Sequence, residues 1–159
     1  MSEANILAKK LIALLREKQL HITCAESCTG GGIAYYLTSV DHASKVFDYG
    51  FVTYSNSAKQ DLLSVDKDTL DSYGAVSLET VSSMCAGAIN KSKADIAIAV
   101  SGVAGPGGGT EDKPVGTVCI GWQIAEKIIT KKFKFDGDRN QIRIKTIETA
   151  LSHLIDLIK

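Results

Sequence analysis

An uninterrupted apolar run, IAIAV at residues 96–100 directly after Asp95, constrains the fold of this chain more than any other feature. A short segment that is apolar at successive positions is typical of a strand covered on both faces of its sheet. Helices must then pack on both sides of that strand. We therefore predict an α/β protein with a central strand over residues 95–100.

Strand and helix patterns alternate along the rest of the chain. Apolar runs and turn residues predict further strands at 21–25, 46–54, 115–124 and 127–135, the last two as an antiparallel pair. They predict helices over the N-terminal segment, from the glycine run to about Ser39, after Ser55-Asn56-Ser57, at 66–72, at 78–90 and over the C-terminal segment. Thr29 is the expected N-cap of the second helix, and Asp138 with Gln141 forms a capping box before the last. The economical arrangement is a three-layer α/β/α sandwich around a mixed sheet of about five strands.

Composition favours a single domain, over residues 1–159, that acts on a small molecule. The chain has 159 residues, is 45% hydrophobic and has equal numbers of acidic and basic residues, 18 of each. Such a balance provides no electrostatic footprint for nucleic acid or an anionic membrane. The N-terminal segment has the spacing of an amphipathic helix without a continuous apolar signal region, so we expect a cytoplasmic protein.

The cysteines and histidines predict neither a disulfide framework nor a metal site. Cys24, Cys28, Cys85 and Cys119 lack a C-x-x-C pair, and the three histidines lie far apart in the sequence. We expect buried free thiols, with no metal and no cofactor.

A serine stands where the first strand gives way to a glycine-rich helix start, in AESCTGGG at residues 25–32. The Ser27 hydroxyl could act as a nucleophile if a base removes its proton, and the backbone N–H groups of Cys28, Thr29 or Gly30 could hold the resulting oxyanion. The alternative is a passive phosphate cradle. The pattern matches neither the dinucleotide-binding nor the P-loop fingerprint.

A second segment, TYSNSAK at residues 53–59, supplies a phenol and an amine. Lys59 falls in the first turn of a predicted helix, where the positive end of the helix dipole lowers the pKa of an ammonium group. Taken singly, Tyr54 is as well explained by packing at a strand end, and Lys59 by a solvated helix surface.

Other candidates lie at predicted element ends, where ligands of open α/β sheets gather. Ser101 and Gly102 could line a ring or ribose pocket, although a simple turn is the alternative. Arg139, at the start of the last helix, could bind a phosphate, against an ion pair with Asp136 or Asp138. Lys113, in a polar loop, is the weakest of these candidates.

Several longer segments occur together in one order over nearly the whole chain. They are AESCTGG at 25–31, GFVTYSN at 50–56 with Lys59, GAVS at 74–77, SGVAGP at 101–106, KPVGTV at 113–118 and GDR at 137–139. In these segments the chain resembles the CinA C-terminal domain family, whose stand-alone members are nicotinamide-nucleotide amidases. It departs from the family pattern at Gly32, where a bulkier residue is usual, and in the extra glycine within residues 107–109.

The resemblance implies deamidation of nicotinamide mononucleotide to nicotinic acid mononucleotide and ammonia. It implies that Ser27 is the nucleophile, that Lys59 is the general base and that Tyr54 stands between them to relay or orient the proton. Substrate contacts are expected from the following residues: Glu26, Gly31, Ser101, Gly102 and Arg139. For Glu26 an ordinary hydrogen-bonded carboxylate is an equal alternative. As a base, Lys59 needs a pKa lowered from about 10.4 to near 7, and a cationic pyridinium would lower it further.

Two other functions remain open at this point. The first is a nucleotide-binding or interaction module of the same family without catalysis. The second is a thiol redox protein that uses Cys24 and Cys28, although their spacing matches no dithiol motif. A homo-oligomer is plausible for so small an enzyme, without a diagnostic interface stripe.

Overall fold

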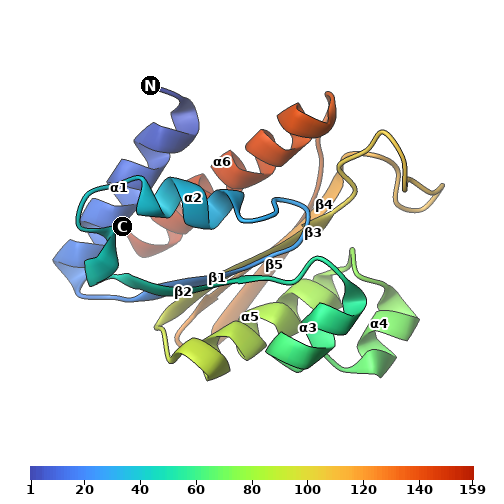
Figure 1. Cartoon of the computed structure of the whole chain (residues 1–159), viewed down its shortest axis with the longest axis horizontal. Coiled ribbons are helices and arrows are strands. Elements are labelled where there is room, and N and C mark those ends of the chain that lie inside the picture. Colours follow the sequence, from blue (N-terminus) through green and yellow to red (C-terminus); the bar gives the residue numbers. More distant parts are fainter.

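A five-stranded mixed sheet divides the molecule into three layers, as the sequence predicts (Figure 1). The computed structural model describes all residues, 1–159. The strands are β1 (Ile22–Glu26), β2 (Phe47–Val52), β3 (Ile96–Gly102), β4 (Thr117–Ile124) and β5 (Lys127–Lys134), and they lie in the order β2-β1-β3-β4-β5. The pairs β1–β2 and β1–β3 are parallel, whereas β3–β4 and β4–β5 are antiparallel.

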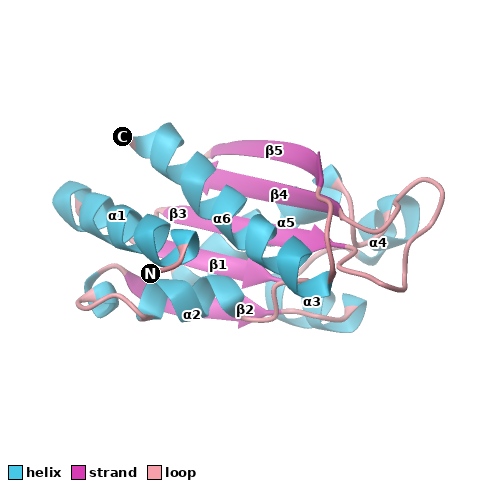
Figure 2. Cartoon of the chain, turned by 90° about the horizontal axis from the view of Figure 1, so that it is seen from above, coloured by secondary structure: helices cyan, strands magenta, loops and turns pink.

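Helices cover both faces of the sheet (Figures 1 and 2). One face carries α1 (Glu3–Lys18), α2 (Gly32–Thr38) and α6 (Arg139–Ile158), with a short 3-10 helix at Ala43–Lys45. The other face carries α3 (Asn56–Leu63), α4 (Lys67–Tyr73) and α5 (Leu78–Ser92). None of these helices combines the length and the apolar character that a bilayer span requires.

The central strand β3 explains why its sequence is apolar at every position. Ile96, Ile98 and Val100 belong to the core cluster beneath α1 and α6. Ala97 and Ala99, which point the other way, belong to the cluster beneath α5. Both faces of β3 are therefore buried, as the sequence predicts, with large side chains on one side and small ones on the other.

The parallel strands bring three segments to one edge of the sheet. Glu26, the last residue of β1, is paired with Val52 of β2 and Val100 of β3. Because parallel strands end at the same edge, the residues that follow these positions emerge side by side. Ser27, the Thr53–Lys59 segment and Ser101 are thereby placed together.

Two local predictions differ from the structure. The strand predicted at 46–54 ends at Val52, and Thr53 continues beside β1 through a single bond from its N–H to the Glu26 carbonyl, at 2.8 Å. Thr29 does not cap α2: the helix begins at Gly32 after a glycine N-cap without a side-chain bond. The hydroxyl of Thr29 donates instead to the buried carboxylate of Glu26.

Candidate active site

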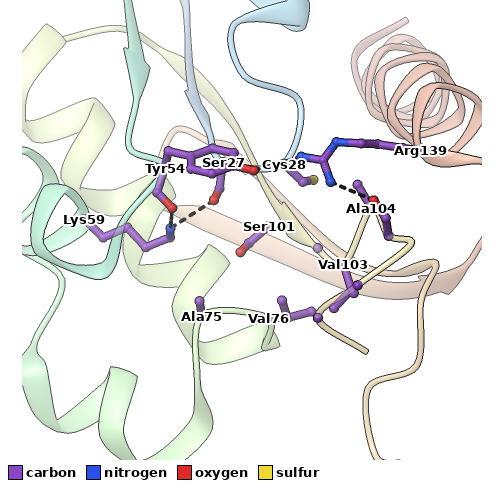
Figure 3. A pocket seen from close by; sticks show the side chains of 14 residues that line it. Ser27, Cys28, Tyr54, Lys59, Ala75, Val76, Ser101, Val103, Ala104 and Arg139 are labelled. Atoms are coloured by element: carbon purple, nitrogen blue, oxygen red, sulfur yellow. Dashed lines mark hydrogen bonds between the residues drawn. The ribbon is translucent and has the colours of Figure 1, made fainter. Parts of the chain in front are cut away.

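A cavity of about 320 Å³ opens at the carboxyl edge of the parallel strands (Figure 3). Its walls come from the turn after β1, the start of α3, the α4–α5 connection, the loop after β3 and the first residue of α6. The lining residues are Ser27, Cys28, Tyr54, Lys59, Ala75, Val76, Ser101, Gly102, Val103, Ala104, Gly105, Gly107, Gly108 and Arg139.

The amine of Lys59 reaches the hydroxyl of Ser27 directly. Its Nζ lies 3.0 Å from Ser27 Oγ and 2.8 Å from the carbonyl oxygen of Thr53. The side chain of Ser55 caps α3 and so fixes the helix turn that carries the lysine. Lys59 is only 1% exposed, and burial lowers its pKa from 10.5 to about 8. Desolvation by burial is thus the main cause of the lowered pKa.

The hydrogen-bond partners of Lys59 decide where a lone pair would point. Besides Ser27, the amine faces two backbone carbonyls, those of Thr53 and Tyr54, the latter at 3.5 Å. Carbonyl oxygens only accept hydrogen bonds, so a neutral amine directs its two N–H groups to them. Its lone pair is then left for the Ser27 hydroxyl, which is the arrangement of a general base and a nucleophile.

Tyr54 does not bridge this pair, contrary to the predicted relay. Its phenolic oxygen lies 3.0 Å from Nη2 of Arg139, and the residue is 61% exposed. Because Ser27 and Lys59 are in direct contact, no intermediate group is needed between them. Arg139 also donates through Nη1 to the Gly105 carbonyl at 2.8 Å, so it joins Tyr54 to the loop after β3.

The turn after Ser27 leaves three backbone N–H groups without an acceptor, those of Cys28, Thr29 and Gly31. Gly30 donates its N–H to the Ser27 carbonyl at 3.0 Å and is therefore not free to hold an oxyanion. Cys28 and Thr29 donate to no backbone or side-chain acceptor, and Cys28 lines the cavity. Gly30 and Gly31 have φ of +58° and +98°, a region that suits glycine, which explains the glycines of this turn.

Glu26 and Gly31 lie outside the cavity lining, although both were expected to contact substrate. Glu26 is fully buried, and its carboxylate accepts hydrogen bonds from the N–H groups of Ile33 and Ala34 at 2.8 and 3.1 Å. It thereby occupies the N-terminus of α2, a favourable place for a negative charge. Its position is that of the hydrogen-bonded structural carboxylate.

Ser101 and Gly102 line the cavity at the end of β3, as predicted, and the Ser101 hydroxyl has no protein partner (Figure 3). Lys113 lies elsewhere: its amine donates to the Tyr73 carbonyl at 2.6 Å and is not part of the lining. No group of three or more His, Cys, Asp or Glu side chains is placed to hold a metal ion.

Sequence reasoning missed Arg143. Its Nε donates to the Cys28 carbonyl at 3.1 Å and its Nη2 to the Thr29 carbonyl at 3.0 Å. Arg143 is four residues after Arg139, so both project from one face of α6. The four-residue spacing from Arg139 was the one signal for Arg143 in the sequence. Its hydrogen-bond partner Cys28 lies 115 residues away in the chain and could not be inferred from that spacing.

Cys24 in β1 and Cys28 in the turn that follows it are poor candidates for redox chemistry. Cys24 and Cys28 are buried and free, and burial raises both thiol pKa values, that of Cys28 to about 12. A thiol that remains protonated at neutral pH is a weak nucleophile and does not readily exchange disulfides.

Comparison with known proteins gives one consistent family. A model of the CinA C-terminal domain matches residues 4–158. A relative from Enterobacter agglomerans, the nicotinamide-nucleotide amidohydrolase PncC, is 45% identical over 98% of this chain and 99% of its own length. A CinA-like protein of Akkermansia muciniphila is 44% identical over 94% of the chain, which covers only 36% of that protein. The chain spans little more than a third of several curated relatives that it matches.

Solved structures agree with this match over the whole chain. The crystal structure of competence/damage inducible protein CihA from Agrobacterium tumefaciens has a TM-score of 0.96 and 42% identity, and it covers 100% of this chain and 98% of the other. A competence or damage-inducible protein from Enterobacter asburiae has a TM-score of 0.96 and 36% identity over the full length of both.

Proposed function

Because the chain belongs to the CinA C-terminal domain family, we propose that it is a nicotinamide-nucleotide amidohydrolase that converts nicotinamide mononucleotide and water to nicotinic acid mononucleotide and ammonia. The amidohydrolase among the relatives matches end to end, so a stand-alone enzyme of this length has a precedent. We thus assign to this chain the activity that is named for the Enterobacter agglomerans protein.

The 3.0 Å contact between Ser27 Oγ and the buried amine of Lys59 carries the proposal. The Ser27 oxygen would attack the carbon of an amide carbonyl placed over it, as the Ser27 hydroxyl proton passes to Lys59 Nζ. The new C–O bond leaves a tetrahedral oxyanion, which the free N–H groups of Cys28 and Thr29, the two residues after Ser27, could hold.

Lys59 then serves twice more. It returns its proton to the amide nitrogen, the C–N bond breaks and ammonia leaves an acyl ester on Ser27. A water that enters in place of ammonia transfers a proton to Lys59 as it attacks the ester, and the Ser27 oxygen recovers that proton as it leaves. Atoms and charge balance over the two steps, and the chain ends as it began.

Arg139 is the cation best placed for the phosphate. It lines the same cavity as the Ser27–Lys59 pair, and it is already oriented by Tyr54 and Gly105. A guanidinium can form a bidentate pair with a phosphate. In this scheme Tyr54 positions Arg139 and does not carry a proton.

Ammonia release from nicotinamide mononucleotide tests the proposal. We expect activity in the wild type and a loss of about 10³-fold or more in kcat for Ser27→Ala and Lys59→Met. Ser57→Ala is the matched control, because Ser57 is an exposed residue of α3 outside the cavity lining and should leave kcat unchanged.

Two results would contradict the proposal. Full turnover by Ser27→Ala would exclude the serine mechanism. Binding of the nucleotide without any turnover by the wild type would favour the non-catalytic module. A cytoplasmic location and assembly into an oligomer stay predictions.

A further inference from the structure

Two of the three free N–H groups in the turn after Ser27, those of Cys28 and Thr29, belong to peptides whose carbonyls accept hydrogen bonds. In a trans peptide the N–H and the C=O point in opposite directions, so a bond to the oxygen also orients the N–H. The Cys28 N–H shares its peptide with the Ser27 carbonyl, which accepts from Gly30. The Thr29 N–H shares its peptide with the Cys28 carbonyl, which accepts from Arg143 Nε at 3.1 Å.

Arg143 is also connected to the first of these peptides. Its Nη2 donates to the Thr29 carbonyl at 3.0 Å, and that carbonyl shares its peptide with the Gly30 N–H. The Gly30 N–H in turn donates to the Ser27 carbonyl at 3.0 Å. A continuous series of hydrogen bonds therefore runs from the guanidinium to the Cys28 N–H through two peptides, and to the Thr29 N–H through one.

Hydrogen bonds in series polarise one another, and a bond from a charged donor is stronger than one between neutral groups. We propose that Arg143 is a positioning residue that orients and polarises the Cys28 and Thr29 N–H groups for the oxyanion. This inference rests on the proposed function, since it assigns a partner to the same reaction. Arg143 itself does not line the cavity, so it acts through the backbone and not by touching the substrate.

A role in packing alone would predict something different. Arg143 is half-buried, and a Cβ at Gly30 would lie 3.4 Å from its Nη2, so the side chain also fills space beside the turn. Loss of packing would loosen the whole turn and would weaken the binding of flat and tetrahedral ligands alike. Loss of polarised donors would weaken only ligands that place a negative oxygen in the oxyanion position.

Pyridine-3-boronic acid distinguishes these possibilities. Its boron forms a bond with the Ser27 oxygen while the hydroxyl proton passes to Lys59. The product is a tetrahedral boronate with one oxygen in the oxyanion position. Nicotinamide, which has a flat and uncharged amide on the same pyridine ring, is the comparison ligand. For Arg143→Gln we expect kcat and boronate affinity to fall together by about 10- to 100-fold, somewhat less than the loss of a direct oxyanion donor. KM and the affinity for the flat ligand should stay within about twofold of the wild type, as expected of a group that acts on the transition state.

Two further variants complete the test. Arg143→Lys keeps the charge but cannot hold both carbonyls in a fixed fork, so it should recover only part of the lost kcat. Lys145→Gln removes a positive charge from the exposed side of the same helix and should leave both affinities unchanged. Urea unfolding of each variant shows whether the fold persists.

Equal losses of boronate and flat-ligand affinity in Arg143→Gln, or full activity in that variant, would overturn the inference. The failure of the proposed function has a different signature. If the wild type binds the boronate but releases no ammonia, the amidase proposal fails while the boronate comparison still decides the role of Arg143. A wild-type protein that neither binds the boronate nor releases ammonia would overturn both the amidase proposal and the role of Arg143.

Discussion

Lys59 is kept almost dry by the elements around it, although a lysine amine is ordinarily hydrated. Its hydrogen bonds to two carbonyls offset part of the lost hydration, but the pKa still falls to about 8. At neutral pH most of the enzyme therefore holds the amine protonated, and a fraction of roughly a tenth holds it as a base. Activity should depend on that fraction.

We predict that kcat/KM rises with pH along a limb centred near pH 8, because only the neutral amine of Lys59 can accept the Ser27 proton. Below that pH the rate should fall about tenfold per pH unit. A pH profile of ammonia release measures this limb. A limb near 10.5, the ordinary value for lysine, would show that the amine is solvated and not a buried base.

The same shift predicts how stability changes with pH. The folded pKa of Lys59 lies below its unfolded value of 10.5, so the unfolded chain binds more protons between pH 8 and 10.5. The resulting penalty, about 3 kcal/mol, is fully present below pH 8 and disappears as the pH rises to 10.5. Burial raises the pKa of Cys28 and Cys85, which acts in the opposite direction above about pH 9. The difference in unfolding free energy between wild type and Lys59→Met isolates the lysine, and a difference that does not change with pH would contradict the burial argument.

At the scale of elements, α6 holds several segments of the site in place. Three residues on one face of the helix, at successive intervals of four, contact three separate segments. Arg139 bonds to Tyr54 and Gly105, Arg143 bonds to the turn after β1, and Ile147 packs against Gly32. Space at Gly32 is limited by this packing, because an added Cβ would lie 2.6 Å from Ile147 Cδ1.

We predict that Gly32→Ala is destabilising in the wild type and tolerated better when Ile147→Val removes the Cδ1 atom. The coupling between the two substitutions should be about 1 kcal/mol in the free energy of unfolding, as for residues in direct contact. Gly107→Ala is the matched control, because a Cβ there meets nothing within 4 Å and should show no coupling to Ile147→Val. Additive effects of Gly32→Ala and Ile147→Val, measured by urea unfolding, would contradict this account.

Helices and strands could be predicted from the sequence where the local pattern of residues decides them. The hydrogen-bond partners of side chains that are distant in the sequence could not. The apolar run of β3 gave the buried central strand, and Asp138 with Gln141 gave the capping box of α6. Ser27 and Lys59 were predicted from the family resemblance, and the parallel strands explain why they meet. The hydrogen-bond partners of Glu26, Tyr54 and Arg143 could not be predicted, because tertiary structure supplies them, from up to 115 residues away for Arg143.

At the scale of the whole molecule, the cavity lies where both helical layers meet the edge of the sheet. The loop between β3 and β4, residues 103–116, forms one wall and is tied to each layer. Arg139 of α6 donates to the Gly105 carbonyl, and Lys113 of the loop donates to the Tyr73 carbonyl at the end of α4. The loop therefore connects layers that the sheet otherwise separates.

We predict that Lys113→Met loosens this loop without unfolding the protein. Deuterium uptake over residues 103–116 should increase, and KM for nicotinamide mononucleotide should rise about 2- to 10-fold, the equivalent of one lost hydrogen bond of about 0.5–1.5 kcal/mol. The value of kcat should change little, since Lys113 does not line the cavity. Lys131→Met, which removes an exposed lysine from β5, is the control. Unchanged uptake in Lys113→Met would show that the loop holds its position without this tie.

The carboxylate that closes the start of α2 also determines which way round a ligand enters. With Glu26 accepting the N–H groups of Ile33 and Ala34, that helix end has no room for another anion. Of the two cations on the cavity wall, Lys59 is buried against Ser27, whereas Arg139 stands at the start of α6. A molecule with a phosphate at one end and an amide at the other then has a single favourable heading, with the phosphate beside α6.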